Sequence, residues 1–167
     1  MKYIAVLILF FPILSFAQEQ ACNAVLSKNI SSHTGLLNSK VIAIVSGEPC
    51  YKAKLKIEIY ANGALLYQYK ESFKPHIAVH WEDVIEKDAI DFLSREIEDY
   101  NFIKCSELPE IEQSGYLPYY GNLLVSEQQY KSYKNSNCAA YIHTFKQYEG
   151  NRIVVFPKNK EQAVVVR

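Results

Sequence analysis

A strict alternation of apolar and polar residues between Tyr51 and Tyr60 is the clearest pattern in the chain. Its apolar positions are Tyr51, Ala53, Leu55, Ile57 and Ile59, and its charged positions are Lys52, Lys54, Lys56 and Glu58. Successive side chains of a strand point to opposite faces of a sheet. The pattern therefore predicts a half-buried antiparallel strand with one face in water.

A second alternating run, from Leu65 to Tyr69, follows after an Asn-Gly pair, and together the two runs predict a hairpin. A two-residue turn would place Ile57 opposite Gln68 and mix polar groups into the apolar face. A three-residue loop, with Gly63 in the left-handed conformation, would place Ile57 opposite Tyr67. We therefore expect the three-residue loop.

The spacing of apolar residues changes to three and four positions in the segment from about Ala78 to Tyr100, which follows Pro75. The apolar stripe comprises Trp81, Val84, Ile85, Ala89, Phe92, Leu93 and Ile97. This spacing places the stripe on one side of an α-helix. Acidic residues in the first turns would meet the positive end of the helix dipole. The segment predicts one long amphipathic helix.

Several further segments have the patterns of regular elements. The β-branched run from Lys40 to Ser46 predicts a buried strand, and Ser126 to Ser132 predicts a short helix with Ser126 as its N-cap. Near the C-terminus a three-stranded meander is predicted over Ala139–Lys146, Arg152–Phe156 and Gln162–Val166. The first mature stretch, up to Leu37, is polar, and its pattern is ambiguous, so no element is assigned to it.

The order of these elements is strands, one long helix, an irregular middle and strands again. The sequence therefore predicts an α+β fold, in which an antiparallel β-sheet of about five to six strands in two groups packs against the long amphipathic helix. How the two groups of strands join is open. Because no repeat or linker-like composition interrupts the chain, we expect residues 18–167 to form a single domain.

Residues 1–17 have the pattern of a secretory signal peptide. Lys2 precedes an uncharged apolar run from Ile4 to Phe16, and Ser15-Phe16-Ala17 supplies the small residues of a cleavage site. The run is shorter than the roughly 18 residues of a membrane-spanning helix, so we expect cleavage. The mature chain would begin at Gln18, not at a cysteine that could carry lipid. We expect an exported soluble protein, periplasmic or secreted and not a lipoprotein, without membrane insertion of the mature chain.

The charge balance narrows the class of partner. The chain carries 18 basic and 18 acidic residues, and cleavage of residues 1–17 would remove one of these charges, that of Lys2. The mature chain is therefore nearly neutral. Proteins that bind nucleic acid usually carry a basic excess or stripe, so no nucleic-acid partner is expected. The sequence contains no GxSxG, HExxH or phosphate-binding loop, and we expect no cofactor.

The mature chain has an even number of cysteines: Cys22, Cys50, Cys105 and Cys138. In an exported protein this predicts two disulfides, and the spacing fits neither a zinc knuckle nor a CxxC redox pair. Four cysteines allow three pairings. We favour Cys22–Cys50 and Cys105–Cys138, because each pair closes a loop of about 30 residues.

Three histidines are candidates for metal binding or catalysis. His76 and His80 are four residues apart and precede Glu82, but Pro75 puts His76 at or before the helix start. The two rings would then not share a helix face, so no metal site is expected. His143 lies on an alternating strand and is interpreted as a packed or partly exposed strand residue, not as a catalyst. An enzyme is therefore the less favoured class.

Lysines and tyrosines offer two candidate binding surfaces. The row Lys52, Lys54 and Lys56, with Lys70 across the hairpin, is either a solvated sheet face or a surface for an anionic partner, such as a phosphorylated glycan or an acidic protein.

Among 13 tyrosines, three gather in a loop rich in Pro and Gly: Tyr116, Tyr119 and Tyr120. Tyrosine is enriched at recognition surfaces, so this loop is a candidate binding site. The alternative is that these rings cover a sheet edge or helix end.

These patterns favour a non-enzymatic exported binding protein, of the inhibitor or immunity-factor type, for another exported protein or a cell-envelope component. The alternatives are a glycan- or small-ligand-binding module and, less favoured, an unrecognised hydrolase. An exposed aromatic protrusion would support the first class, and a tyrosine-lined pocket would support the second. Histidines that meet carboxylates in a cleft would support the third.

Overall fold

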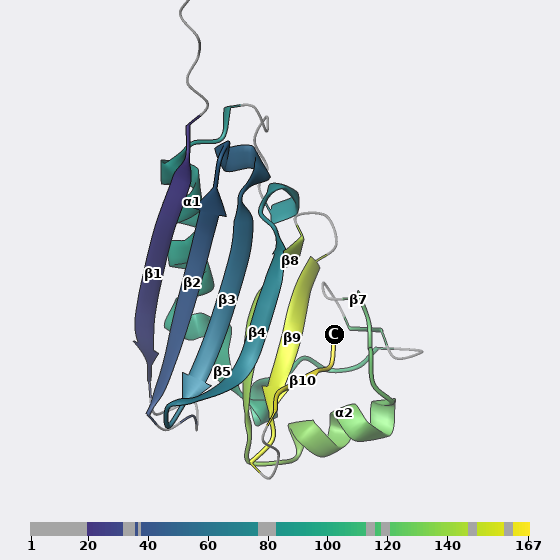
Figure 1. Cartoon of the computed structure of the whole chain (residues 1–167). Helices are drawn as coiled ribbons and strands as arrows, with labels where there is room; N and C mark the ends of the chain where they lie inside the picture. Colours follow the sequence, from purple (N-terminus) through teal and green to yellow (C-terminus); the bar gives the residue numbers. More distant parts are fainter. Residues whose placement is uncertain are drawn as a thin grey trace, which may run out of the picture.

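The computed structural model describes residues 20–31, 36, 38–76, 83–112, 116–117, 121–146, 150–158 and 162–167. These residues form two four-stranded antiparallel sheets, a two-stranded sheet and two α-helices (Figure 1). The predicted α+β class is confirmed. The predicted arrangement, one sheet packed against one long helix, is wrong.

The first sheet is an antiparallel meander of β1 (Cys22–Ile30), β2 (Ser39–Gly47), β3 (Lys54–Ala61) and β4 (Ala64–Ser72). The predicted strands in the regions of β2 and β3 are confirmed, and their apolar residues line one buried face: Val41, Ala43, Val45, Leu55, Ile57 and Ile59. Strand β1 lies in the stretch for which the sequence predicts no element. Polar residues interrupt its alternation, and pairing along its whole length with β2 makes it a strand.

The β3–β4 hairpin has a two-residue turn, so the predicted three-residue loop is wrong. Asn62 and Gly63 form the turn with φ of 50° and 80°, and a type I′ turn requires positive φ at both positions. The register then shifts by one residue between Tyr60 and Ile59, where Leu66 of β4 has no partner, and this shift places Ile57 opposite Tyr69. This bulge-like shift keeps the apolar residues of both strands on one face without a longer loop.

The second sheet has the strand order β10-β9-β8-β5. Its strands are β5 (Phe102–Lys104), β8 (Ala139–Lys146), β9 (Gly150–Phe156) and β10 (Val164–Val165). The predicted C-terminal meander is confirmed, whereas β5 is too short to show a period. Two further short strands, β6 (Tyr116–Leu117) and β7 (Gly121–Asn122), pair with each other.

Helix α1 (Glu86–Glu96) is much shorter than the helix predicted from 78 to 100. The backbone of Ile85 is extended and donates its N–H to the Asp88 carboxylate at 2.9 Å, so the helix begins after this residue. The side chain of Ile85, which the periodicity assigns to the apolar stripe, is exposed. Residues 77–82, which include Trp81, lie outside the described residues.

Helix α2 (Glu127–Lys134) confirms the predicted short helix. Ser126 is its N-cap, and the Ser126 hydroxyl accepts a hydrogen bond from the Gln129 N–H at 3.2 Å. Tyr130 and Tyr133 are buried in the core that α2 shares with the second sheet. The Ser126 cap therefore fixes the start of α2, and the burial of Tyr130 and Tyr133 stabilises the helix.

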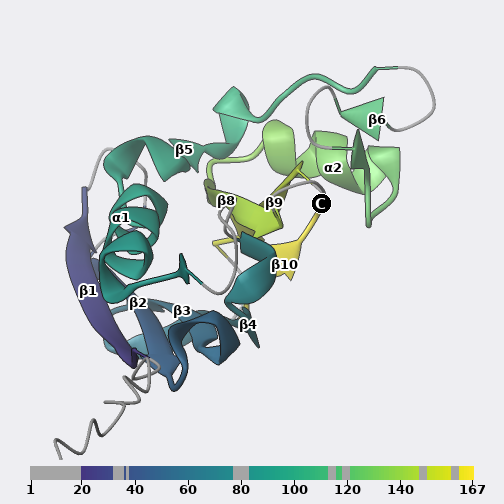
Figure 2. The ribbon, with the colours of Figure 1, turned by 90° about the horizontal axis from the view of Figure 1, so that it is seen from above.

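The elements stack in three layers, which Figure 2 shows from above. Helix α1 packs against β1 and β2, and the second sheet lies beside α1, against β4. Helix α2 covers the other face of the second sheet. Strand β9 contributes to both resulting cores: Val154 and Phe156 face the first sheet, and Ile153 and Val155 face the α2 side.

Two disulfides have the pairing that the loop lengths favour. Cys22–Cys50 joins the start of β1 to the turn after β2, and Cys105–Cys138 joins the turn after β5 to the residue before β8. In the described part of the chain no helix has the length and apolar character needed to cross a membrane.

Candidate functional site

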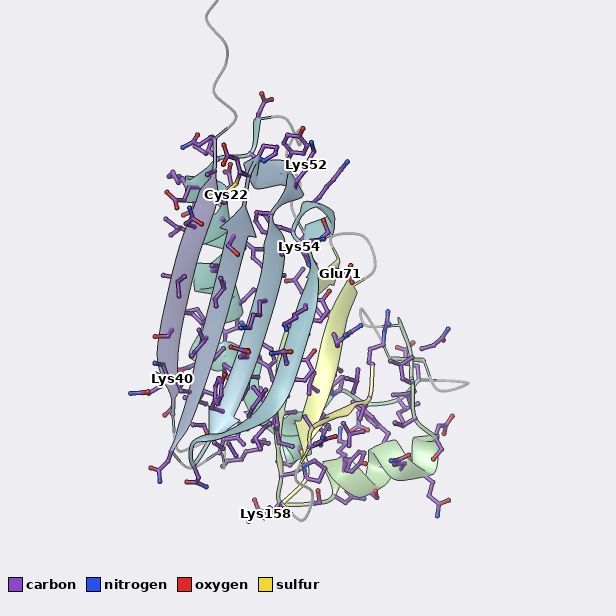
Figure 3. The ribbon with its side chains drawn as sticks, viewed as in Figure 1. Cys22, Lys40, Lys52, Lys54, Glu71 and Lys158 are labelled. Atoms are coloured by element: carbon purple, nitrogen blue, oxygen red, sulfur yellow. A yellow bond between two sulfur atoms is a disulfide. The ribbon has the colours of Figure 1, made fainter. Side chains whose placement is uncertain are left out.

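The outer face of the first sheet has no helix or sheet packed on it in the described part of the chain. Helix α1 and the second sheet both lie on its other side (Figures 1 and 2). We call this surface the lysine face and define it by four lysines and the aliphatic side chains beside them: Lys40, Lys54, Lys56, Lys70, Val25, Ile42 and Ile44. Figure 3 views this face.

Strand register brings the lysines together. Lys56 on β3 lies directly opposite Lys70 on β4, and on its other side it lies opposite Ile44. The row continues to Val25 on the edge strand β1, which is 59% exposed. The predicted row is therefore confirmed for Lys54, Lys56 and Lys70, which lie on strands. Lys52 lies in the turn before β3, with its Nζ 5.2 Å from the centre of the Tyr51 ring.

Glu58 is a nearly buried carboxylate on this same face. It is 6% exposed, and its Oε1 accepts hydrogen bonds from Lys56 Nζ at 3.0 Å and Gln68 Nε2 at 2.6 Å. Burial acts to raise the pKa of Glu58, but the hydrogen bonds from Lys56 and Gln68 outweigh it, so the pKa is lowered. Glu58 therefore stays ionised and compensates Lys56.

The other lysines of the face keep uncompensated charge. Among the described residues, neither Lys54 nor Lys70 forms an ion pair, and the exposed acid Glu71 also forms none. Like charges directly opposite each other on neighbouring strands are destabilising. Lys70 therefore lies opposite a lysine whose charge Glu58 balances, and its own charge and that of Lys54 have no acidic partner among the described residues.

A cluster of tyrosine and histidine side chains lies between the two sheets. Tyr67 Oη is 3.1 Å from His143 Nε2, and Tyr69 Oη is 3.4 Å from His76 Nε2. The rings of Tyr141 and His143 stack with their centres 5.2 Å apart. His143 is 1% exposed, and burial lowers its pKa to about 3. His143 is therefore a packed strand residue, one of the two forms that the sequence predicts.

Glu96, the last residue of α1, joins this cluster. It is 3% exposed, and its Oε2 accepts a hydrogen bond from the Thr144 N–H at 3.1 Å. Its backbone carbonyl accepts one from the Tyr141 hydroxyl at 3.0 Å. Burial raises the pKa of Glu96 to about 7, with partial opposition from the Thr144 hydrogen bonds and from Arg95.

Two histidines and the Glu96 carboxylate thus lie in one cluster, but inside the core, and no hydrogen bond between Glu96 and either histidine is seen among the described residues. The cavity described below is lined by other residues. Catalysis needs substrate within hydrogen-bond reach of the base. The geometry of His76, His143 and Glu96 therefore favours a structural role, in which Glu96 ties the end of α1 to β8.

Two other predictions fall largely on residues that the structure does not describe. Tyr119, Tyr120 and His80 lie outside the described residues, and of Tyr116 only the backbone, in β6, is described. The tyrosine-loop surface therefore stays a prediction. Within the described ranges, no group of three His, Cys, Asp or Glu side chains is arranged to hold a metal ion.

A cavity of about 250 Å³ opens between the β3–β4 turn and the ends of β8 and β9. Its described lining residues come from both sheets: Leu36, Ala61, Asn62, Leu66, Cys138, Ala139, Phe156, Pro157, Lys158, Gln162 and Ala163. No tyrosine is among them. These residues are scattered through the sequence, and no local pattern connects them.

Comparisons of the chain with protein-family models, with curated proteins and with solved structures find no match.

Proposed function

We propose that this chain is an exported binding protein, of the inhibitor or immunity-factor type, that recognises an acidic surface of another exported protein through its lysine face. The charges of Lys54 and Lys70 carry the proposal. Lys70 lies opposite Lys56, Lys54 lies two residues before Lys56 on β3, and neither Lys54 nor Lys70 forms an ion pair among the described residues. A partner's carboxylates would pair with these two lysines.

The shape and composition of the face favour a protein partner over a glycan. The face is the surface of a sheet, and the cavity lies elsewhere. Interfaces between proteins combine an apolar centre with polar and charged surroundings. Here Val25, Ile42 and Ile44 supply half-exposed or exposed aliphatic area between the lysines.

Export belongs to the same proposal. Two disulfides are the pattern of proteins that fold in an oxidising compartment, and they agree with the leader predicted at residues 1–17. Intact-mass analysis of the exported form tests this part. The expected product begins at Gln18, and a product that retains residues 1–17 would contradict it.

The binding test uses two double variants with the same change in net charge. K54E/K70E reverses two charges on the lysine face, and K87E/K131E reverses two exposed charges on α1 and α2. Mature protein of each kind is immobilised and exposed to periplasmic extract, and the captured protein is then purified and its Kd measured. We expect K54E/K70E to weaken binding at least about tenfold, more at low salt, and K87E/K131E to preserve it.

Two results would contradict the proposal. One is a partner whose Kd is unchanged by K54E/K70E. The other is equal weakening by both double variants, which would indicate non-specific attraction. Thermal unfolding of all proteins checks that the variants are folded.

The tyrosine loop provides a separate arm of this experiment. If its rings are interfacial anchors, Y119A/Y120A should weaken binding by roughly 2 kcal/mol or more and leave the Tm almost unchanged. If they are core residues, each truncation should lower stability by roughly 3–5 kcal/mol. A large loss of Tm with unchanged binding would assign the loop to structural cover.

A further inference from the structure

The cavity between the two sheets is a concave site distinct from the lysine face. We propose that it binds a small amphipathic monoanion, with one carboxylate or sulfonate on an apolar ring or short chain. This inference is independent of the lysine face and of its protein partner.

The inner walls of the cavity are apolar. Leu36, Ala139 and Phe156 are buried residues of its lining, and Leu66 and Ala163 are half-buried beside them. The volume of about 250 Å³ exceeds the roughly 150 Å³ of an engineered cavity that holds benzene, and is below the roughly 300–1,000 Å³ of most drug-sized sites. The apolar part of the ligand is therefore about one aromatic ring with a short chain.

The polar groups of the cavity define the other end of the ligand. Asn62 and Gln162 contribute exposed amides, and Lys158 is the charged residue among the described lining residues, with no acid in that set. Figure 3 labels Lys158 at the lower end of the molecule, where the two sheets meet. Among the described lining residues, one cation beside neutral hydrogen-bonding groups and apolar walls matches a single negative charge on an apolar body.

Backbone hydrogen bonds and a disulfide hold the walls of the cavity in place. The Ala163 N–H donates to the Leu66 carbonyl at 3.1 Å, which ties the β10 segment to β4. The Asn62 N–H donates to the Asn38 carbonyl at 3.1 Å and anchors the turn on one side. On the other side, Cys138 is held by its disulfide to Cys105. A pre-formed site avoids the ordering cost that weakens binding of small ligands.

The test compares 3-phenylpropionate with its neutral amide, 3-phenylpropionamide, on the disulfide-bonded mature protein. Equilibrium dialysis measures Kd, and amide chemical-shift changes in NMR locate the site. For a ligand of this size we expect a Kd on the order of 0.1–1 mM for the acid, and at least about tenfold weaker binding of the amide. The shifts should cluster at residues such as Leu66, Ala139 and Ala163.

Variants decide which groups are responsible. K158Q should weaken the acid about tenfold and leave the amide unchanged. K87Q, which removes an exposed lysine on α1, should change neither Kd. A163F, which fills the cavity from a half-buried position, should abolish binding of both; should it not fold, K158Q and the shift map still decide.

Three outcomes would overturn the proposal. They are no saturable binding of the acid, equal Kd values for acid and amide with no effect of K158Q, and shift changes that map away from the cavity. Results with this ligand pair do not depend on the protein capture experiment, so either proposal can fail alone.

Discussion

Glu58 and Glu96 both have little solvent-accessible surface, Glu58 at the outer face of the first sheet and Glu96 deeper, between the layers, and their pKa shifts have opposite signs. Glu58 is 6% exposed and Glu96 is 3% exposed. Glu58 on the lysine face has Lys56 at 3.0 Å, and its pKa is lowered. Glu96 in the interior receives a backbone N–H from Thr144, and burial raises its pKa to about 7.

The difference shows that the two faces of one sheet hold charge differently. On the lysine face a charged donor accompanies the buried carboxylate, so ionisation is favoured. In the interior, burial favours the neutral forms of both Glu96 and His143. Glu58 is therefore ionised beside Lys56 on the outer face, whereas between the layers the neutral forms of Glu96 and His143 are favoured.

The same substitution at three isoleucines measures how different the faces are. Ile153 lies in the core beside α2, Ile57 on the inner face of β3, and Ile44 on the lysine face. Ile→Ala at Ile153 or Ile57 should cost roughly 4 kcal/mol, because each leaves a buried cavity, and at Ile44 roughly 1 kcal/mol. Urea unfolding measures all three. Equal losses at Ile44 and Ile57 would show that the lysine face is covered.

E96Q should stabilise the protein at high pH. An acid whose folded pKa is raised contributes stability below its ordinary pKa near 4.5 and loses it as the pH rises through 7. At pH 8 the wild type bears the cost of ionising Glu96, whereas Gln stays neutral and can accept the Thr144 N–H. We expect a gain of roughly 3 kcal/mol at pH 8 and no difference near pH 4.5.

Urea unfolding across this pH range measures the E96Q difference, with the exposed Glu127→Gln as control. The control should stay within about 0.5 kcal/mol of wild type at both pH values. Destabilisation of E96Q at pH 8 would show that the ionised carboxylate is the form that the interior favours.

E58Q should have the opposite sign. Its lowered pKa means that Glu58 contributes stability above its ordinary pKa near 4.5 and loses it as the pH falls through the folded value. Removal of the charge leaves Lys56 opposite Lys70 uncompensated, so we expect a loss of roughly 1 kcal/mol at pH 7. The loss should become smaller as the pH falls below 4.5. Unfolding midpoints measured from pH 7 downward test this, and a neutral effect at pH 7 would remove the contrast with Glu96.

Truncation of the lysines should have the smallest effect. K54A and K70A should each change stability by less than about 0.5 kcal/mol, because neither side chain is buried or ion-paired among the described residues. A slight stabilisation by K70A would agree with relief of the repulsion from Lys56. A loss above about 1 kcal/mol in thermal unfolding would show that these lysines support the fold instead of a binding surface.

Part of the fold and of the lysine face follows from the sequence. The alternation at 51–60 predicts both the buried face of β3 and the exposure of Lys54, because strand faces alternate whatever the strand pairs with. Helix α1 is predicted at the wrong length because Val84 and Ile85 continue the apolar period. The extended backbone at Ile85, whose N–H donates to Asp88, delays the start of the helix to Glu86.

By itself, the sequence determined features that depend on near neighbours: the β3 alternation, the Ser126 cap and a glycine in the hairpin turn. Tertiary structure alone decided that β1 is a strand, that the β3–β4 register shifts, that Glu96 is buried, and that a cavity forms beside Lys158. The physical reason is sequence distance. Glu96 meets Thr144 across 48 residues, and its desolvation depends on elements that local periodicity does not relate to it.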